Sequence, residues 1–504
     1  MPHHSRARRH KAARLAALAS IAITALLPTL SSHASDPLPP LSDAPTLFRN
    51  VNVLTMTEPG VKSGWSVLVV GGRIAQVGPI DAVTPADTLQ NLTIIEGDGN
   101  AWLIPGLADM HVHMPPYEPG NAQHEAAAFR ACTLLLANGI TTVRGMVGHP
   151  SHPRLRQAIA DGSLLGPTLH IAGPPIHQGI AKTPEEAQAA VRQHAKAGFD
   201  FIKSHRVVQE EVYRAVQTTA AELGIPVTGH VDNEVGITVA MEYPQQQEHL
   251  DAIPAALIAD PNAASQFGQI PPGPVLNVID TNRLPELAKK LAAAGIWSVP
   301  TLSLFETILD QNTPTAELMA RPEMRYIVPQ AVGQWAEQRN ATKFPALWGV
   351  DYGQRAAALR KQITLALADA GVGLMAGSDS PQFFKVVGFS LHDELESLAE
   401  SGLGAERALA CATSNPARYM DSLPNRGSAT GVPPDFGSIA PGKRADLVLL
   451  DADPTININA ARRIQAVMLR GRLIPRAELD ALLAEVERSA RPPFNQEPPL
   501  KSDL

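Results

Sequence analysis

Cysteine is scarce in this chain, whose 504 residues include two, Cys132 and Cys411. Both fall in segments with a helical pattern, and they lie far apart in the sequence. We therefore interpret them as small buried hydrophobic residues rather than as a disulfide pair. An exporting compartment would permit a bridge between them but does not require one.

Long apolar runs are also lacking. The N-terminal run from Leu15 to Leu27 has 13 residues, whereas a membrane-spanning helix needs about 20. Five basic residues precede it and Ser32-His33-Ala34 follows it, which is the three-part pattern of a secretory signal, residues 1–34. We expect a mature chain from Ser35 in the periplasm or outside the cell. The alternative is that the leader stays uncleaved and anchors the protein in the membrane. Export by the twin-arginine route is disfavoured, because Arg8-Arg9 is not followed by the apolar residues that this signal requires.

Basic residues are fewer than acidic ones in this chain. Without the leader the chain has 37 Lys and Arg residues against 49 Asp and Glu residues, a net charge of −12. This balance, with no basic tract, argues against a nucleic-acid partner. About 470 mature residues exceed one ordinary core, so we expect two domains.

Both ends of the mature chain are rich in short strand patterns separated by turns. The expected strands are Leu47–Leu54, Trp65–Val70, Arg73–Val77, Leu92–Glu96, Leu447–Leu450, Ile464–Leu469 and Arg472–Ile474. We predict that residues 35–104 and 426–485 together form one small β-sandwich domain. Residues 486–504 would then be a tail.

Between these ends, residues 105–425 alternate apolar strand patterns with helical ones. The strand candidates are Leu107–His113, Ile140–Arg144, Thr168–Ala172, Phe201–Lys203, Val227–His230, Gln247–His249, Ile296–Thr301 and Gly373–Gly377. Eight strands, seven of them followed by helical patterns such as Glu185–Ala197 and Glu210–Leu223, predict a (β/α)8 TIM barrel. The long interruptions at residues 251–281 and 302–354 are of the kind that shapes or covers a binding site.

Metal-binding residue types gather at the predicted strand ends. Period two places His111 and His113 on one face of the first strand, and neutral imidazole is the commonest metal ligand in proteins. The later strands end in Lys203, His230, His249 and the segment with Asp379. Each alone fits a bland explanation, such as a core histidine, a lysine that extends to solvent or an aspartate helix cap. Core packing does not explain six such groups where a barrel carries its chemistry.

At this point the chain resembles the metal-dependent amidohydrolase superfamily, in its prolidase-like branch with imidazolonepropionase-related sequences. The similarity runs in order from about Leu47 to Leu483. Its motifs are Pro-Gly-Leu-Ala-Asp-Met-His-Val-His at 105–113, Gly-Ile-Thr-Thr-Val-Arg at 139–144, Gly-Phe-Asp-Phe-Ile-Lys at 198–203, Gly-His at 229–230, Glu-His at 248–249, Ala-Gly-Ser-Asp-Ser at 376–380, Ala-Thr-Ser-Asn-Pro-Ala-Arg at 412–418 and Gly-Ser-Ile-Ala-Pro-Gly-Lys-Arg-Ala-Asp-Leu-Val at 437–448.

The resemblance implies a set of ligands for two divalent metal ions, expected to be zinc. His111, His113 and Asp379 would bind the more buried ion, and His230 and His249 the second. Lys203 would bridge the two as a carbamate formed with CO2, because an ammonium can only donate hydrogen bonds while a carbamate offers anionic oxygens. Asp109, two residues before His111, would orient the site as a neighbouring carboxylate rather than bind metal.

The resemblance also implies a reaction. Two metals would lower the pKa of a bridging water and polarise an amide carbonyl, while Asp379 would move a proton from the water to the leaving nitrogen. We expect an exported hydrolase of C–N bonds acting on a small molecule, a dipeptide or an N-acyl amino acid with a free carboxylate. Alternatives on the same site are hydrolysis of a cyclic amide, lactone or phosphotriester, or a scaffold that has lost catalysis.

Residues for the substrate carboxylate are expected beyond the strand ends. Arg144, His177, His205 and Arg206 all fall at the predicted mouth, and arginine can bind a carboxylate through two hydrogen bonds. We select His177 and Arg206, while surface or loop-stabilising roles remain open for each. The composition leaves homo-oligomerisation open, and no membrane association is expected once the leader is removed.

Overall fold

The computed structural model describes residues 40–491, except for 244, 265–272, 345–347, 350, 429–430 and 432. The expected leader, residues 1–34, and residues 492–504 of the expected tail lie outside the described residues. The first residues of that tail, 486–489, instead continue the helix α17 (Arg476–Ser489), where Val486 is buried. Among the described residues, no helix combines the length and the apolarity that crossing a membrane requires.

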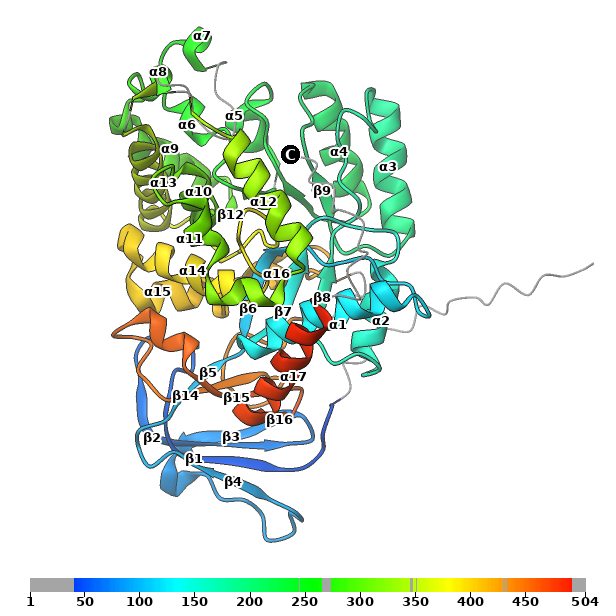
Figure 1. Ribbon diagram of the computed structural model, residues 1–504, viewed down its shortest axis with the longest axis vertical. Helices are drawn as coiled ribbons and strands as arrows, with labels where there is room; N and C mark the ends of the chain where they lie inside the picture. The colour runs from blue at the N-terminus through cyan, green and yellow to red at the C-terminus, as the bar shows by residue number, and fades with distance from the viewer. Residues whose placement is uncertain are drawn as a thin grey trace, which may run out of the picture. The chain divides into compact units, whose positions relative to one another are not determined.

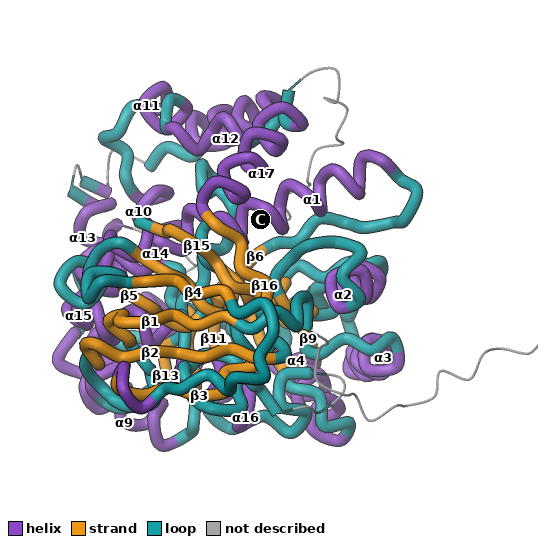
Figure 2. Tube along the Cα trace, turned by 90° about the horizontal axis from the view of Figure 1, so that it is seen from below, coloured by secondary structure: helices purple, strands orange, loops and turns teal. Residues whose placement is uncertain are grey.

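Strands from both ends of the chain share one hydrogen-bonded sheet. They are β1 (Thr46–Val53), β2 (Lys62–Val70), β3 (Arg73–Pro79), β4 (Thr93–Glu96), β5 (Trp102–Pro105), β14 (Leu447–Leu450), β15 (Ile464–Leu469) and β16 (Arg472–Pro475). The order is β16-β15-β14-β5-β1-β2-β3, with β4 paired to β1 (Figures 1 and 2). The antiparallel pairing of β14 with β5 joins the two ends. The two ends of the chain therefore contribute strands to one sheet, as the sequence predicted. That this part of the chain forms a β-sandwich stays a prediction.

Eight parallel strands lie between these ends. They are β6 (Leu107–Val112), β7 (Ile140–Gly145), β8 (Thr168–Ile171), β9 (Ile202–Ser204), β10 (Val227–Gly229), β11 (Gln246–Glu248), β12 (Trp297–Val299) and β13 (Gly373–Leu374). Every residue of β6 and β7 is buried, as expected for parallel strands covered on both faces.

These strands pair in chain order, but in two sheets: β6-β7-β8 and β9-β10-β11-β12-β13. Isolated parallel bridges link Ala172 to Phe201 and Val112 to Ser380, where the two sheets meet. The arrangement is a TIM-barrel-like α/β fold. Closure into one continuous eight-stranded barrel stays a prediction.

Helices follow the parallel strands and supply the outer layer. The main ones are α1 (Ala122–Ala137), α2 (His152–Ala160), α3 (Pro184–Lys196), α4 (Glu210–Glu222), α5 (Gly236–Ala240), α9 (Leu284–Ala293), α13 (Tyr352–Asp369), α14 (Phe389–Leu398), α15 (Gly404–Cys411), α16 (Ser414–Ser422) and α17 (Arg476–Ser489). Cys132 in α1 and Cys411 in α15 are both buried and unpaired, so the expectation of two free cysteines is confirmed. Burial raises the pKa of each thiol to about 12.

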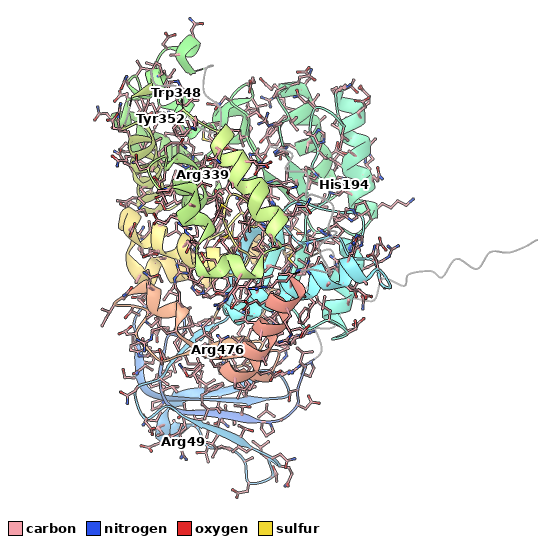
Figure 3. All side chains as sticks on the ribbon, in the orientation of Figure 1. Arg49, His194, Arg339, Trp348, Tyr352 and Arg476 are labelled. Atoms are coloured by element: carbon pink, nitrogen blue, oxygen red, sulfur yellow. The ribbon has the colours of Figure 1, made fainter. Side chains whose placement is uncertain are left out.

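The two long interruptions contain further helices, most of them short. They are α6 (Ile253–Ala256), α7 (Pro261–Ala264), α8 (Gly273–Leu276), α10 (Leu302–Leu309), α11 (Thr315–Met319) and α12 (Pro329–Ala341). In the second interruption, Phe344 and Trp348 pack on Tyr352 at the start of α13, with ring centroids 4.9 and 4.8 Å away. Figure 3 shows Trp348 and Tyr352 close together. This aromatic packing attaches the second interruption to the helical layer.

Candidate metal centre

The carboxyl ends of the parallel strands bring together the residues that the sequence singled out. His111 lies in β6 and His113 one residue beyond it, Lys203 lies in β9, and His230 and His249 directly follow β10 and β11. Asp379 lies in the segment after β13. Apart from His113, whose side chain is 25% exposed, all are buried. Lys203, predicted at a strand end, is 2% exposed.

The Asp379 carboxylate faces three imidazoles. Its Oδ1 lies 3.3 Å from His111 Nε2 and 3.1 Å from His113 Nε2. Its Oδ2 lies 3.7 Å from His249 Nε2. His111, His113 and Asp379 also have ligand atoms close enough together to share one ion. This is the trio that the sequence assigned to the more buried metal.

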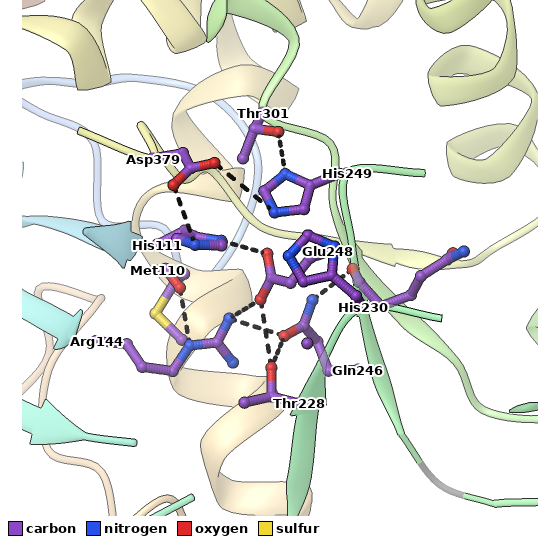
Figure 4. A network of polar contacts seen from close by, with 12 residues as sticks. Met110, His111, Arg144, Thr228, His230, Gln246, Glu248, His249, Thr301 and Asp379 are labelled. Atoms are coloured by element: carbon purple, nitrogen blue, oxygen red, sulfur yellow. Dashed lines mark hydrogen bonds and ion pairs between the residues drawn. The ribbon is translucent and has the colours of Figure 1, made fainter. Parts of the chain in front are cut away.

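In His111, His249 and His230 the Nδ1 atom contacts a buried oxygen, and Figure 4 shows these contacts for His111 and His249. His111 Nδ1 is 2.8 Å from Glu248 Oε2, and His249 Nδ1 is 2.7 Å from Thr301 Oγ1. His230 Nδ1 is 2.7 Å from Asp251 Oδ2. A ring fixed through Nδ1 presents Nε2, the geometry usual in histidine ligands.

Lys203 has a polar atom with no partner. Its Nζ is buried and forms no hydrogen bond, although an unpaired buried charge is costly. Burial lowers the pKa of the amine, and Glu248 and Asp379 only partly oppose that shift. Near this amine, His230 and His249 are the histidines predicted to bind the second ion, and their ring centroids are 4.6 Å apart. A buried amine that is readily neutral is the form that can react with CO2.

The protonation states suit cation binding. Burial lowers the pKa of His111 and of His249 well below the usual value, and that of His230 to about 3, so all three rings are neutral. Burial by itself would raise the pKa of Asp379, but His111 and His113 lower it below its usual value. Neutral imidazoles around a carboxylate form a donor set that fits zinc or a similar divalent ion.

Backbone geometry at the site is unusual. His249, Thr301 and Asp379 have φ values of 58°, 49° and 51°, in the left-handed region that residues other than glycine seldom adopt. Such conformations concentrate at functional sites. At His249 the change of direction ends the strand alternation, and consequently Glu248 and His249 both reach the site.

Asp109 lies beside the site but not against a ring. Its carboxylate accepts the backbone N–H of His111 at 3.1 Å and the hydroxyl of Ser378 at 2.6 Å. The carboxylates that orient imidazoles are those of Glu248 and Asp251, which our sequence reasoning missed. The signal was present, since Glu248 is an acidic residue inside a buried strand and directly precedes His249.

The residues proposed for the substrate differ in accessibility. Arg206 is exposed and His177 is half-buried, and their loops touch through a 3.3 Å hydrogen bond from the Gln178 N–H to the Arg206 carbonyl. His205 packs edge-on against His230, with centroids 4.7 Å apart. Arg144 is fully buried and is therefore not at the mouth.

The profile of the Amidohydrolase family matches residues 102–474. The chain belongs to the amidohydrolase family. This membership supports a hydrolase acting on carbon–nitrogen bonds, and it confirms the superfamily recognised from the sequence motifs.

Similar proteins support the fold. An uncharacterised protein of Mycobacterium tuberculosis is 24% identical over 426 residues, 80% of this chain and 90% of that protein. A Xaa-Pro dipeptidase with bound methionine has a TM-score of 0.60 at 20% identity, over 86% of this chain and 100% of the other. Bottromycin amidohydrolase has a TM-score of 0.64 at 21% identity, over 91% and 92% of the two chains.

Proposed function

We propose that this protein is an exported, binuclear metal-dependent amidohydrolase that cleaves a dipeptide or an N-acyl amino acid with a free carboxylate. The Xaa-Pro dipeptidase and the amidohydrolase among its structural neighbours support an amide substrate. The prolidase-like motifs of the sequence point the same way.

Lys203 is the observation that carries the proposal of two metals. Its buried, unpartnered Nζ lies in a centre of histidines and Asp379. Reaction of the neutral amine with CO2 forms an N–C bond and releases a proton, which leaves a carbamate with two anionic oxygens. Those oxygens are the ligand type that a pair of cations held by histidines requires.

The residues of the chain have separate roles in the reaction. When bound, two divalent ions would supply an activated water and polarise the amide carbonyl. Asp379, anionic and within 3.3 Å of two imidazoles, accepts the proton of the attacking water at a carboxylate oxygen and donates it to the departing nitrogen. That protonation is needed because the amine of a resonance-stabilised amide is a poor leaving group.

The substrate carboxylate is assigned to Arg206 and His177. The exposed Arg206 guanidinium can donate two parallel hydrogen bonds to a carboxylate. His177 follows β8 on a loop whose backbone is hydrogen-bonded to that of Arg206, so we assign both side chains to the same anion. A free carboxylate would thereby place the amide toward the buried centre.

A substrate panel tests the proposal. Zinc-loaded protein is assayed on Xaa-Pro dipeptides, N-acyl amino acids, their methyl esters, hydantoins, lactones and a phosphotriester. We expect turnover of the free acids and at least tenfold lower kcat/KM for the methyl esters. Turnover confined to the cyclic or phosphotriester substrates would contradict the assignment to a dipeptide or an N-acyl amino acid, and no turnover by metal-loaded protein would favour a non-catalytic scaffold.

Export is tested separately. Expression of the full chain in a bacterium should yield periplasmic or secreted protein whose N-terminal residue is Ser35. Membrane-bound protein that still begins at Met1 would contradict cleavage and support the anchor.

A further inference from the structure

Arg144 and Glu248 form an ion pair beneath the histidines. Arg144 Nη2 lies 2.7 Å from Glu248 Oε1, and both side chains are 0% exposed. Glu248 Oε2 accepts the Nδ1 hydrogen of His111 at 2.8 Å. One carboxylate therefore connects a buried cation to a predicted metal ligand (Figure 4).

Arg144 also contacts the strand that carries this ligand. Its Nε donates to the carbonyl of Met110, the residue before His111, at 2.8 Å. Its Nη2 donates at 2.7 Å to Gln246 Oε1, on the same strand as Glu248. The guanidinium carbon lies 5.4 Å from the centroid of the Phe201 ring, which restricts it further. A single buried guanidinium thus fixes both the backbone and the side-chain partner of His111.

We propose that Arg144 and Glu248 act as one positioning unit that fixes His111 and sets the metal affinity of the His111, His113 and Asp379 trio. The inference rests on the proposed function, because it requires a metal at this trio. Neither residue touches the substrate or binds the ion in this role.

The physical reason lies in the two oxygens of Glu248. A carboxylate is an acceptor only, so the hydrogen of the His111 ring must sit on Nδ1 and the lone pair on Nε2, which faces Asp379. Arg144 compensates the charge of Glu248, because a buried carboxylate without its cation would be strongly destabilising. The planar guanidinium of Arg144 can donate to the Met110 carbonyl and to the Glu248 carboxylate at the same time. The single ammonium of a lysine cannot reproduce this geometry.

The histidines of the second half have other partners. His249 Nδ1 contacts the hydroxyl of Thr301, and His230 Nδ1 contacts the carboxylate of Asp251, so neither ring is oriented by Glu248 or Arg144. Disturbing the Arg144–Glu248 unit should therefore weaken the first ion and leave the histidines of the second in place.

The test measures metal binding by apoprotein prepared with a chelator, using Zn²⁺ competition and the visible spectrum of bound Co²⁺. The variants are Glu248→Gln, Arg144→Lys and the charge-free double variant Arg144→Met with Glu248→Gln. Asp200→Asn is the matched control, because Asp200 is a buried carboxylate that is paired with Arg156 at 2.9 Å and accepts the backbone N–H of Ile171 at 2.8 Å, and it is not among the proposed ligands.

We expect Glu248→Gln and Arg144→Lys to weaken the tighter Zn²⁺ site by roughly 10- to 100-fold and to alter the Co²⁺ spectrum. Asp200→Asn should lower the Tm without either effect. If the single variants fail to fold, the double variant, which buries no unpaired charge, is expected to fold and still bind weakly.

One result would overturn the positioning role alone, and another would overturn the proposed function. Wild-type affinity and an unchanged Co²⁺ spectrum in a folded Glu248→Gln or double variant would overturn the positioning role and leave the metal centre intact. Failure of the unsubstituted protein to bind either ion would overturn the proposed function itself, and with it this inference.

Discussion

Asp109 and Ser378 are joined twice, because the Asp109 carboxylate accepts the backbone N–H of Ser378 at 3.0 Å and its hydroxyl at 2.6 Å. Asp109 lies two residues before His111, and Ser378 directly precedes Asp379. These contacts therefore fix the distance between two segments that are remote in sequence and carry ligands of the same proposed ion.

Removing one of these contacts should loosen the centre. Ser378→Ala deletes the hydroxyl donor without adding bulk, and we expect roughly tenfold weaker Zn²⁺ binding, as is usual when a group supporting a ligand is lost. Competition with a chromogenic chelator measures this. Ser401→Ala is the control, since Ser401 is buried and its hydroxyl donates to the Leu398 carbonyl away from the centre. Equal affinity in the two variants would contradict a supporting role for Ser378.

Lys203→Ala tests the carbamate. The change deletes two proposed ligand oxygens, so metal content should fall from two per chain toward one or none and kcat by orders of magnitude. Acetate or formate in the vacated space should restore part of the activity. Elemental analysis and turnover are compared with Lys361→Ala, which removes a lysine paired with Glu306 and Glu400 on the helical layer. Two metals and full activity after Lys203→Ala would overturn the bridging role of Lys203.

Gly377→Ala should damage the centre through packing. A Cβ at this position would lie 2.5 Å from Val299 Cγ1 and 2.7 Å from His111 Cβ. Overpacking of this kind costs about 1 to 3 kcal/mol, and it would displace a ligand. We expect a lower Tm together with weaker metal binding, whereas Gly333→Ala, in open space within α12, should leave metal binding unchanged and raise the Tm slightly, because alanine favours a helix. Unchanged metal affinity after Gly377→Ala would contradict the expected displacement of His111.

Glu394 should make stability depend on pH. Its carboxylate accepts the backbone N–H groups of Leu302 and Ser303, at 3.0 and 2.8 Å, and burial raises its pKa from 4.5 to about 7. The folded protein thus keeps a proton that the unfolded chain releases. The associated stability is complete below about pH 4.5 and is lost as the pH rises through 7.

Replacing this acid separates the two effects. Glu394→Gln leaves only one oxygen acceptor for two N–H groups, so it should lower the Tm at pH 5, where the lost hydrogen bond costs about 1 to 3 kcal/mol. It should also remove the part of the Tm decline between pH 5 and 7 that Glu394 causes. Thermal unfolding at a series of pH values measures both, and identical slopes in the variant and the wild type would disprove the assignment to Glu394.

The sequence by itself predicted the candidate ligands and their order along the chain. Alternation at period two placed His111 and His113 on one face, and apolar runs ending in Lys203, His230 and His249 marked the strand ends. These features are local, because strand periodicity and turn residues act over a few positions. For that reason the strands of the structure lie close to the ranges predicted for them.

Tertiary structure alone decided which groups surround those ligands. Glu248 and Arg144 are 104 residues apart, and pattern analysis places both simply in buried strands. The left-handed backbone at His249 turns Glu248 and His249 toward the same centre, against the alternation that a regular strand would impose. Lys203 Nζ is buried without a hydrogen-bond partner, and this too depends on how the neighbouring strands pack around it. Pairing, burial and desolvation are properties of the assembled fold, so no local pattern could specify them.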